Sequence, residues 1–273
     1  MNKFSIIVLY AVLILFGIIM VLPFVWSVSS SFKDIGEIFN YPPTLIPNNP
    51  IITNYINLIY NTKFVRWYIN SLFITVVYTL SSVFLSALGG YGFAKYVFKG
   101  KSLLFSILIG SMIIPSQLTL VPMFLMINRL KLVDSYLALI LPGLAPAFGI
   151  FLMRQFMVMS IPDELLDAGR IDGCPELSMF TRIVLPLAKP AIGALTIYQF
   201  IGSWNSFLWP LIVIRTEAKF TLPIGLANLM GLYVREYGIV MAGSTLVILL
   251  PIILFLMMQR QFISGLTLGA VKG

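Results

Sequence analysis

The sequence predicts an all-α membrane protein with six transmembrane helices. Of its 273 residues, 59% are hydrophobic and only 10% are charged, and the mean hydropathy is +0.97. Soluble domains carry about 25% charged residues, so this chain has too few charges to cover a soluble fold of its length. One segment departs from the apolar background, the charged stretch of residues 161–186. We call it the charged loop and expect it to contact something outside the membrane.

Six segments are long and apolar enough to span a bilayer, which takes about 20 residues. None of them contains Asp, Glu, Lys or Arg. Carriers that use proton or ion gradients usually place ionisable groups inside the membrane, so we expect this protein to draw its energy from elsewhere. The predicted spans are approximately residues 5–30, 69–94, 103–127, 135–153, 190–212 and 238–258.

The distribution of basic residues favours cytosolic termini. The apolar stretch after Lys3 is longer than a signal-peptide core, and we interpret it as an uncleaved first span that enters from the cytosol. With that orientation, ten of the 18 Lys and Arg residues are cytosolic, and Lys95, Lys99 and Lys101 share one short turn, where such residues count most. The charged loop is then cytosolic, and the net charge of +8 is explained by contact with anionic lipid.

The composition also limits the chemistry of the chain. There is no His, and Cys174 is the single cysteine, so His-based catalysis, His metal sites and internal disulfides are excluded. Gly100-Lys-Ser102 resembles the end of a phosphate-binding loop, but Lys95 stands where the first glycine is required. We therefore predict no catalytic, cofactor or metal site in this chain.

Small residues and prolines mark the central spans. Ser82, Ser86, Gly90 and Ala94 recur every four residues and place small side chains on one helix face, which permits close approach of another backbone. We favour packing within the chain over a subunit interface. Prolines interrupt the third and fourth spans and are expected to bend them; they are Pro115, Pro122, Pro142 and Pro146.

A few neutral polar residues lie within the predicted spans. Amides beside aromatic rings suit a neutral polyol, and the candidates for a translocation path are Gln117, Gln199, Trp204 and Asn205. The alternative is an interfacial aromatic belt with hydrogen bonds between helices. The sequence leaves both interpretations open and slightly favours the second.

The charged loop has the signals of two short helices. Asp163 and Glu164 follow Pro162, as is typical of a helix N-terminus. Gly173 stands where a helix ends with positive φ, and Pro175 allows a second helix to begin. A loop that is only solvated does not need this plan.

The same residues resemble the "EAA" loop of prokaryotic ABC importer permeases. That pattern is Glu-Ala-Ala, three residues, Gly, nine residues and Ile-x-Leu-Pro. The chain has Asp167-Ala168-Gly169, then Gly173, then Ile183-Val-Leu185-Pro186, with both spacings kept. It departs from the pattern at Asp167, which replaces Glu, and at Gly169, which replaces Ala and lowers helix stability by about 1 kcal/mol.

Other blocks resemble the carbohydrate-type importers, and the C-terminal tail is similar to that of maltose-importer permeases of the G type. The blocks are 185–190, 204–205 with 210–211, 221–225 and 265–273. The resemblance implies a type I importer permease fold, with a cytosolic coupling helix at about 163–173 between the fourth and fifth spans. It assigns the ATPase-coupling role to Glu164, Asp167, Ala168, Gly169, Asp172, Gly173, Ile183, Leu185 and Pro186, and an ATPase-contacting tail to Gly269, Val271 and Lys272.

The resemblance also implies the partners and the location. This chain is expected to be a non-enzymatic subunit in a prokaryotic cytoplasmic membrane, paired with a second permease and surrounded by lipid. Two ATPase subunits bind ATP and Mg²⁺, and an extracytoplasmic substrate-binding protein delivers the solute; no nucleic acid is involved. The expected division is a first helix and outer loop (1–66), a transport core (67–262) and a cytosolic tail (263–273).

Two other functions make predictions that this sequence does not meet. A secondary carrier for a neutral polar solute predicts ionisable groups inside the membrane, and a membrane enzyme predicts clustered carboxylates with a metal-ligand pattern; the sequence has neither. The solute itself stays open among oligosaccharides, monosaccharides and glycerol phosphates.

Overall fold

The protein is built from helices. The computed structural model describes residues 3–231 and 236–267, and within them the secondary structure is helical with no strand. Three helices are long: α1 (Lys3–Ser31), α4 (Phe64–Lys95) and α15 (Tyr237–Thr267). The shorter α-helices of the first half are α2 (Ile35–Ile38), α3 (Thr53–Tyr60), α5 (Lys101–Ser111), α6 (Ser116–Arg129) and α7 (Leu137–Ile140).

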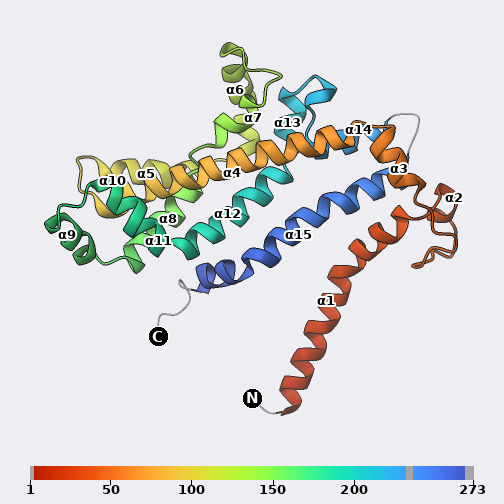
Figure 1. Ribbon diagram of the computed structural model, residues 1–273, viewed down its shortest axis with the longest axis horizontal. Helices are drawn as coiled ribbons and strands as arrows, with labels where there is room; N and C mark the ends of the chain where they lie inside the picture. The colour runs from red at the N-terminus through yellow and green to blue at the C-terminus, as the bar shows by residue number, and fades with distance from the viewer. Residues whose placement is uncertain (1–2, 232–235, 268–273) are drawn as a thin grey trace. The chain divides into compact units, whose positions relative to one another are not determined.

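The second half continues with short helices (Figure 1). These are α8 (Ala147–Ser160), α9 (Asp163–Ile171), α10 (Glu176–Met179), α11 (Leu185–Leu187), α12 (Lys189–Trp204), α13 (Leu208–Val213) and α14 (Leu222–Leu229). Two 3₁₀ turns, η1 (Leu141–Gly143) and η3 (Glu217–Lys219), and one π-helical turn, η2 (Phe180–Val184), complete the described elements.

The chain separates into two compact units. The first contains Met1–Trp67 and Leu222–Pro251, and the second contains Tyr68–Thr221 and Ile252–Gly273. The charged loop and all four predicted path residues belong to the second unit.

Three continuous helical segments are long and apolar enough to cross a membrane: Phe4–Ser31, Phe64–Lys95 and Tyr237–Gln259. They contain the predicted first, second and sixth spans. Three further pairs of helices meet the same criteria only when each pair is taken together, and each is bent at a short break. The described residues therefore supply three candidate spans, or up to six if each bent pair is one crossing.

The third predicted span is not one helix. It consists of α5 and α6, which meet at an angle of 98°. Pro115 precedes α6 with an extended ψ of 129°, and its ring has no N–H to continue α5. Pro122 lies inside α6 without ending it. The prediction of a bend was right at Pro115, but the prediction of a single helix over 103–127 was wrong.

The fourth and fifth predicted spans are also interrupted. Pro146 precedes α8, and the pair Leu137–Gly143 and Ala147–Ser160 is bent by 42°. In the fifth, α12 ends at Trp204 and α13 begins only at Leu208. Because Pro210 cannot donate a hydrogen bond to the preceding turn, residues 190–212 do not form one straight helix.

Helix α8 packs closely against small residues of α4. A Cβ atom on Gly90 would lie 2.6 Å from Met153 Cβ and 2.8 Å from the Arg154 backbone nitrogen, and one on Gly149 would lie 2.3 Å from Ser86 Oγ. Ser82 and Ser86 are fully buried. The small face predicted on the second span therefore packs within the chain, as the sequence favoured.

In the first unit, the segment after α1 combines short helices with irregular backbone. The proline-rich part between α2 and α3 is irregular, but α3 forms after the last proline and buries Leu58 completely. Lys33 is fully buried in this unit; its Nζ donates to the Thr44 carbonyl and lies 4.7 Å from the Trp26 ring centroid.

Candidate functional site

The charged loop folds as its local sequence predicts. Pro162 precedes α9 with extended backbone, and Asp163 and Glu164 occupy the first turn, where carboxylates interact favourably with the helix dipole. Gly173 has φ +72° and ends the turn after α9. Such a conformation costs a glycine little. Pro175 then precedes α10, and α9, α10 and α11 gather at the C-terminal end of α4 (Figure 1).

The inner side of the loop is an apolar core. Leu166 and Gly169 are buried, together with Met179 and Phe180 from the second helical stretch. A Cβ atom at Gly169 would lie 3.2 Å from the Met179 sulfur, which gives a steric reason for glycine where the family pattern has alanine. Ile183 and Leu185 are half-buried against the same core, while Pro186 is exposed at the start of α11.

Lys95, the last residue of α4, ties the loop to that helix. Its Nζ lies 2.6 Å from Asp163 Oδ1, and its side chain is 5% exposed. The same Nζ donates to the Ile161 carbonyl. The hydrogen bond from Lys95, supported by its charge, lowers the pKa of the Asp163 carboxyl below the ordinary value. The sequence predicted Lys95 only as a charge that orients the chain in the membrane. In the structure it also connects the charged loop to α4.

Glu176 forms a second tie that the sequence did not single out. Its carboxylate accepts hydrogen bonds from Tyr96 Oη and from Tyr91 Oη, the latter at 3.4 Å. Arg170 Nε lies 3.1 Å from Glu176 Oε1, and Arg170 Nη1 lies 2.8 Å from Asp167 Oδ1. The Tyr96 hydrogen bond, followed by the Arg170 contact, lowers the pKa of Glu176 despite partial desolvation. An acid after Pro175 is a signal for a helix start, and only the fold brings it to two tyrosines about 80 residues away.

The outer side of the loop carries apolar and acidic residues together. Leu165 is 40% exposed, Ile171 86% and Leu177 70%. Beside them, the predicted coupling residues Glu164, Asp167, Ala168, Asp172 and Gly173 are also exposed. The structure thus divides the apolar residues of α9 into an inner pair, Leu166 and Gly169, and an outer pair, Leu165 and Ile171, that is exposed.

A second candidate site is a cavity of about 770 Å³ within the second unit. We call it the Gln199 cavity. Its polar lining is Ser71, Thr75, Tyr78, Ser116, Thr119, Tyr198, Gln199, Ser203, Ser206, Trp209 and Thr221. Apolar residues from α4, α6, α7, η1, α12, α13 and α15 complete the lining, and none of the described lining residues is charged.

Only one of the four predicted path residues lines this cavity. Gln199 does, but Gln117, Trp204 and Asn205 do not. Trp204 is buried against Tyr68 and Phe200 with ring centroids 5.5 and 5.9 Å away. Four other residues of the same predicted spans line it instead, and they are Thr119, Ser203, Ser206 and Trp209.

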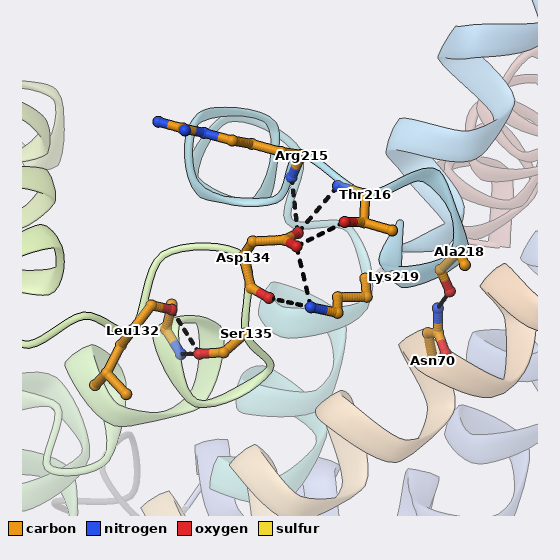
Figure 2. A network of polar contacts seen from close by, with 9 residues as sticks. Asn70, Leu132, Asp134, Ser135, Arg215, Thr216, Ala218 and Lys219 are labelled. Atoms are coloured by element: carbon orange, nitrogen blue, oxygen red, sulfur yellow. Dashed lines mark hydrogen bonds and ion pairs between the residues drawn. The ribbon is translucent and has the colours of Figure 1, made fainter.

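A third polar site joins two loops of the second unit. Asp134 has φ +61°, and its carboxylate accepts from the Arg215 and Thr216 backbone nitrogens at 3.0 Å each, from Thr216 Oγ1 at 2.6 Å and from Lys219 Nζ at 3.0 Å. Figure 2 shows these contacts converging on one carboxylate. We call these four residues the Asp134 cluster. Burial alone raises the pKa of Asp134, but the hydrogen bonds from Thr216, Arg215 and Lys219 outweigh it and hold the pKa well below its usual range.

The remaining predicted residues, Gly269, Val271 and Lys272, lie outside the described residues.

These features place the chain among transport proteins of the membrane. It belongs to the family described as binding-protein-dependent transport system inner membrane component, whose model matches residues 82–264. That match includes the charged loop and the Asp134 cluster. Members of this family are transport components.

Individual relatives are similar over most of their length. The arabinooligosaccharides transport system permease protein AraQ of Halalkalibacterium halodurans is 40% identical over 93% of this chain and 92% of its own. The sn-glycerol-3-phosphate transport system permease protein UgpE of Escherichia coli O1:K1 / APEC is 33% identical over 93% of each chain. A bacterial ABC transporter involved in the import of the acidic polysaccharide alginate has the same fold, with a TM-score of 0.86, 24% identity, and coverage of 95% of this chain and 97% of that one.

Proposed function

We propose that this chain is the permease subunit of an ATP-driven importer that carries a carbohydrate across the cytoplasmic membrane. Membership of the family supports the transport role, and the 40% identity to an arabinooligosaccharide permease supports a carbohydrate. In this proposal the bent pairs α5 with α6 and α7–η1 with α8 are each one crossing, and α12 with α13 forms the fifth span, so that the chain has six spans and both termini are cytosolic. The division into residues 1–66, 67–262 and 263–273 remains part of the proposal.

The observation that carries the proposal is the outer side of the charged loop. Leu165, Ile171 and Leu177 are exposed apolar side chains on short helices, and exposed apolar residues beside charged ones are typical of protein interfaces. The loop is held in place, because Lys95 and Glu176 connect it to the end of α4. A push on this surface is therefore transmitted to a long helix rather than absorbed by a flexible loop.

The proposed partner at this surface is an ATPase subunit. Two such subunits would bind ATP and Mg²⁺, and Glu164, Asp167 and Asp172 would add polar contacts around the apolar centre. Closure of the ATPases then favours one orientation of the spans over another. This requires that the ATPases bind the permease with different free energies in the two orientations. The tail residues Gly269, Val271 and Lys272 are proposed as a further ATPase contact.

The remaining partners follow from the same proposal. A second permease completes the pathway, and an extracytoplasmic binding protein delivers the solute. A secondary carrier remains the alternative, and it differs in needing no ATPase.

Reconstitution separates these two functions. Vesicles containing this chain, its partner permease and the ATPase subunits should take up arabinotriose or lactose from the matching binding protein only when ATP is supplied on the ATPase side. Vesicles with this chain alone should take up neither sugar. Uptake by the chain alone, without ATP, contradicts the proposal and favours the carrier.

A further inference from the structure

We infer that the Gln199 cavity is a binding site for an uncharged, hydroxylated solute in this subunit itself. The inference rests on the proposed function and deepens it, since that proposal does not say which subunit holds the solute within the membrane. It starts from the polar atoms that the fold leaves without partners.

Two buried polar side chains face the cavity with unused hydrogen-bonding capacity. Gln199 is 5% exposed and Thr221 is 6% exposed, and both line the cavity. Gln199 Nε2 and Thr221 Oγ1 have no hydrogen-bond partner among the residues that the structure describes. Buried polar atoms are nearly always paired, and an unpaired one costs about 1–3 kcal/mol. A ligand or water in the cavity would remove that cost.

The other end of the Gln199 amide is already oriented. Tyr78 Oη donates to Gln199 Oε1 at 3.4 Å, which leaves the Nε2 hydrogens available as donors. Ser203, one helical turn further along α12, donates from Oγ to Thr75 Oγ1 at 3.2 Å. The site therefore offers an amide donor and several hydroxyl groups that both donate and accept, which matches the hydroxyl groups of a sugar.

The size and charge of the cavity narrow the ligand class. Its volume of about 770 Å³ is within the range of roughly 300–1,000 Å³ for small-molecule sites. Because no lining residue is charged, a phosphorylated or carboxylated solute would lose its hydration without gaining a counter-charge. Tyr198 and Trp209 add aromatic surface against which apolar faces of a sugar ring can lie. A neutral oligosaccharide fits this lining better than a glycerol phosphate.

Protection of a cysteine in the cavity tests the inference directly. The complete importer would carry Cys174→Ser, which removes the single native cysteine of this chain, and Ser206→Cys in the cavity lining. Arabinotriose and lactose should slow alkylation of the new cysteine, whereas glycerol 3-phosphate should not. In a matched complex with Ser102→Cys, far along the sequence and outside this lining, none of the three probes should change the rate.

A second set of variants distinguishes binding from a structural effect. Gln199→Leu should raise the sugar concentration needed for half-protection about 10-fold. The melting temperature should change little, because loss of the 3.4 Å hydrogen bond from Tyr78 is offset by removal of the unpaired, buried Nε2 group. Thr221→Val should act in the same direction. Thr196→Val is the control, since the Thr196 hydroxyl bonds to the Ile192 carbonyl of its own helix at 2.7 Å, and it should leave half-protection unchanged.

The outcomes separate this inference from the proposed function. If the importer takes up arabinotriose or lactose with ATP but neither sugar protects the cysteine, the cavity holds only water and the inference is wrong, while the proposed function stands. If neither sugar is taken up nor protects, both are wrong. Equal protection by glycerol 3-phosphate overturns the assignment to an uncharged solute.

Discussion

The charged loop and the Asp134 cluster are both polar sites at loops, yet they are built in opposite ways. In the Asp134 cluster four donors converge on one carboxylate, so its polar groups are satisfied within the chain. In the charged loop the contacts to α4 hold the inner side, while Ile171 and Leu177 remain exposed on the outer side. A satisfied cluster stabilises the fold, whereas an unsatisfied apolar surface on a fixed element indicates a partner.

The largest expected effect is at the outer side of the loop. Ile171→Asp should abolish most ATPase co-purification and sugar uptake, because a charge replaces the most exposed apolar side chain of this surface. Loss of a central interface residue costs about 2 kcal/mol or more. The measurement is the ATPase-to-permease ratio after affinity purification of the complex.

Ile171→Val is the matched control, and it should keep the ratio and the uptake near those of the wild type. Since the Ile171 side chain is 86% exposed, Ile171→Asp should not change membrane insertion. Normal ATPase co-purification and full sugar uptake by the Ile171→Asp variant would contradict the interface role of the charged loop.

The next effect concerns the packing of α8, the helix that precedes the charged loop, against α4. Gly90→Ala should destabilise the permease by about 3 kcal/mol, because the new methyl group would lie 2.8 Å from the Arg154 backbone nitrogen. It should also weaken ATPase binding, since α8 precedes the loop directly. Gly92→Ala should have neither effect, because the added Cβ would meet nothing within 4 Å in the described residues beyond its own helix backbone and chain neighbours. Equal melting temperatures for the two variants would contradict this packing.

A smaller effect is expected at the Asp134 cluster. Asp134→Asn should lower stability by about 2 kcal/mol, because it weakens charge-assisted hydrogen bonds while asparagine tolerates the positive φ. ATPase binding should be unchanged. Asp172→Asn, the same change at an exposed carboxylate of the charged loop, should not alter the melting temperature. The comparison between the two regions fails if Asp134→Asn releases the ATPase.

The smallest effect is a pH dependence shared by both regions. The folded-state pKa values of Glu176, Asp163 and Asp134 are lowered. In acid, the unfolded state therefore binds more protons than the folded state. Their stabilisation is present above the ordinary carboxyl pKa of about 4 and is lost as the pH falls below it. The melting temperature should be flat from about pH 8 to 5 and decrease below about pH 4. Glu176→Gln and Asp134→Asn should each reduce that decrease, and a melting temperature that rises in acid would contradict the assignment.

The sequence predicted the charged loop well because its signals are local. Pro162, Gly173 and Pro175 each act within a few residues, and each has the predicted effect on the backbone. The contacts that fix the loop were not predictable in this way, since Tyr91 and Tyr96 reach Glu176 only after α4 and α10 have packed together.

The cavity shows the limit of the same reasoning. Residue type selected Gln199, but it also selected Trp204, which is five positions further along α12 and is buried away from the lining. Ser203, four positions after Gln199 and so on the same helix face, does line it. The prolines predicted a bend in this span but not its angle of 98° between α5 and α6, so the sequence alone did not show that Ser116 rather than Gln117 lines the cavity.

The central claim is that the charged loop is covered by the ATPase, and the native Cys174 tests it without a substitution in the loop. This half-buried cysteine follows Gly173, and its backbone nitrogen donates to the Gly169 carbonyl at 2.9 Å. Alkylation of Cys174, followed by mass spectrometry, should be several-fold slower in the complete importer than in the permease pair without ATPase. An added cysteine at Arg129→Cys, outside the loop, should react equally in both. An unchanged Cys174 rate would contradict the claim.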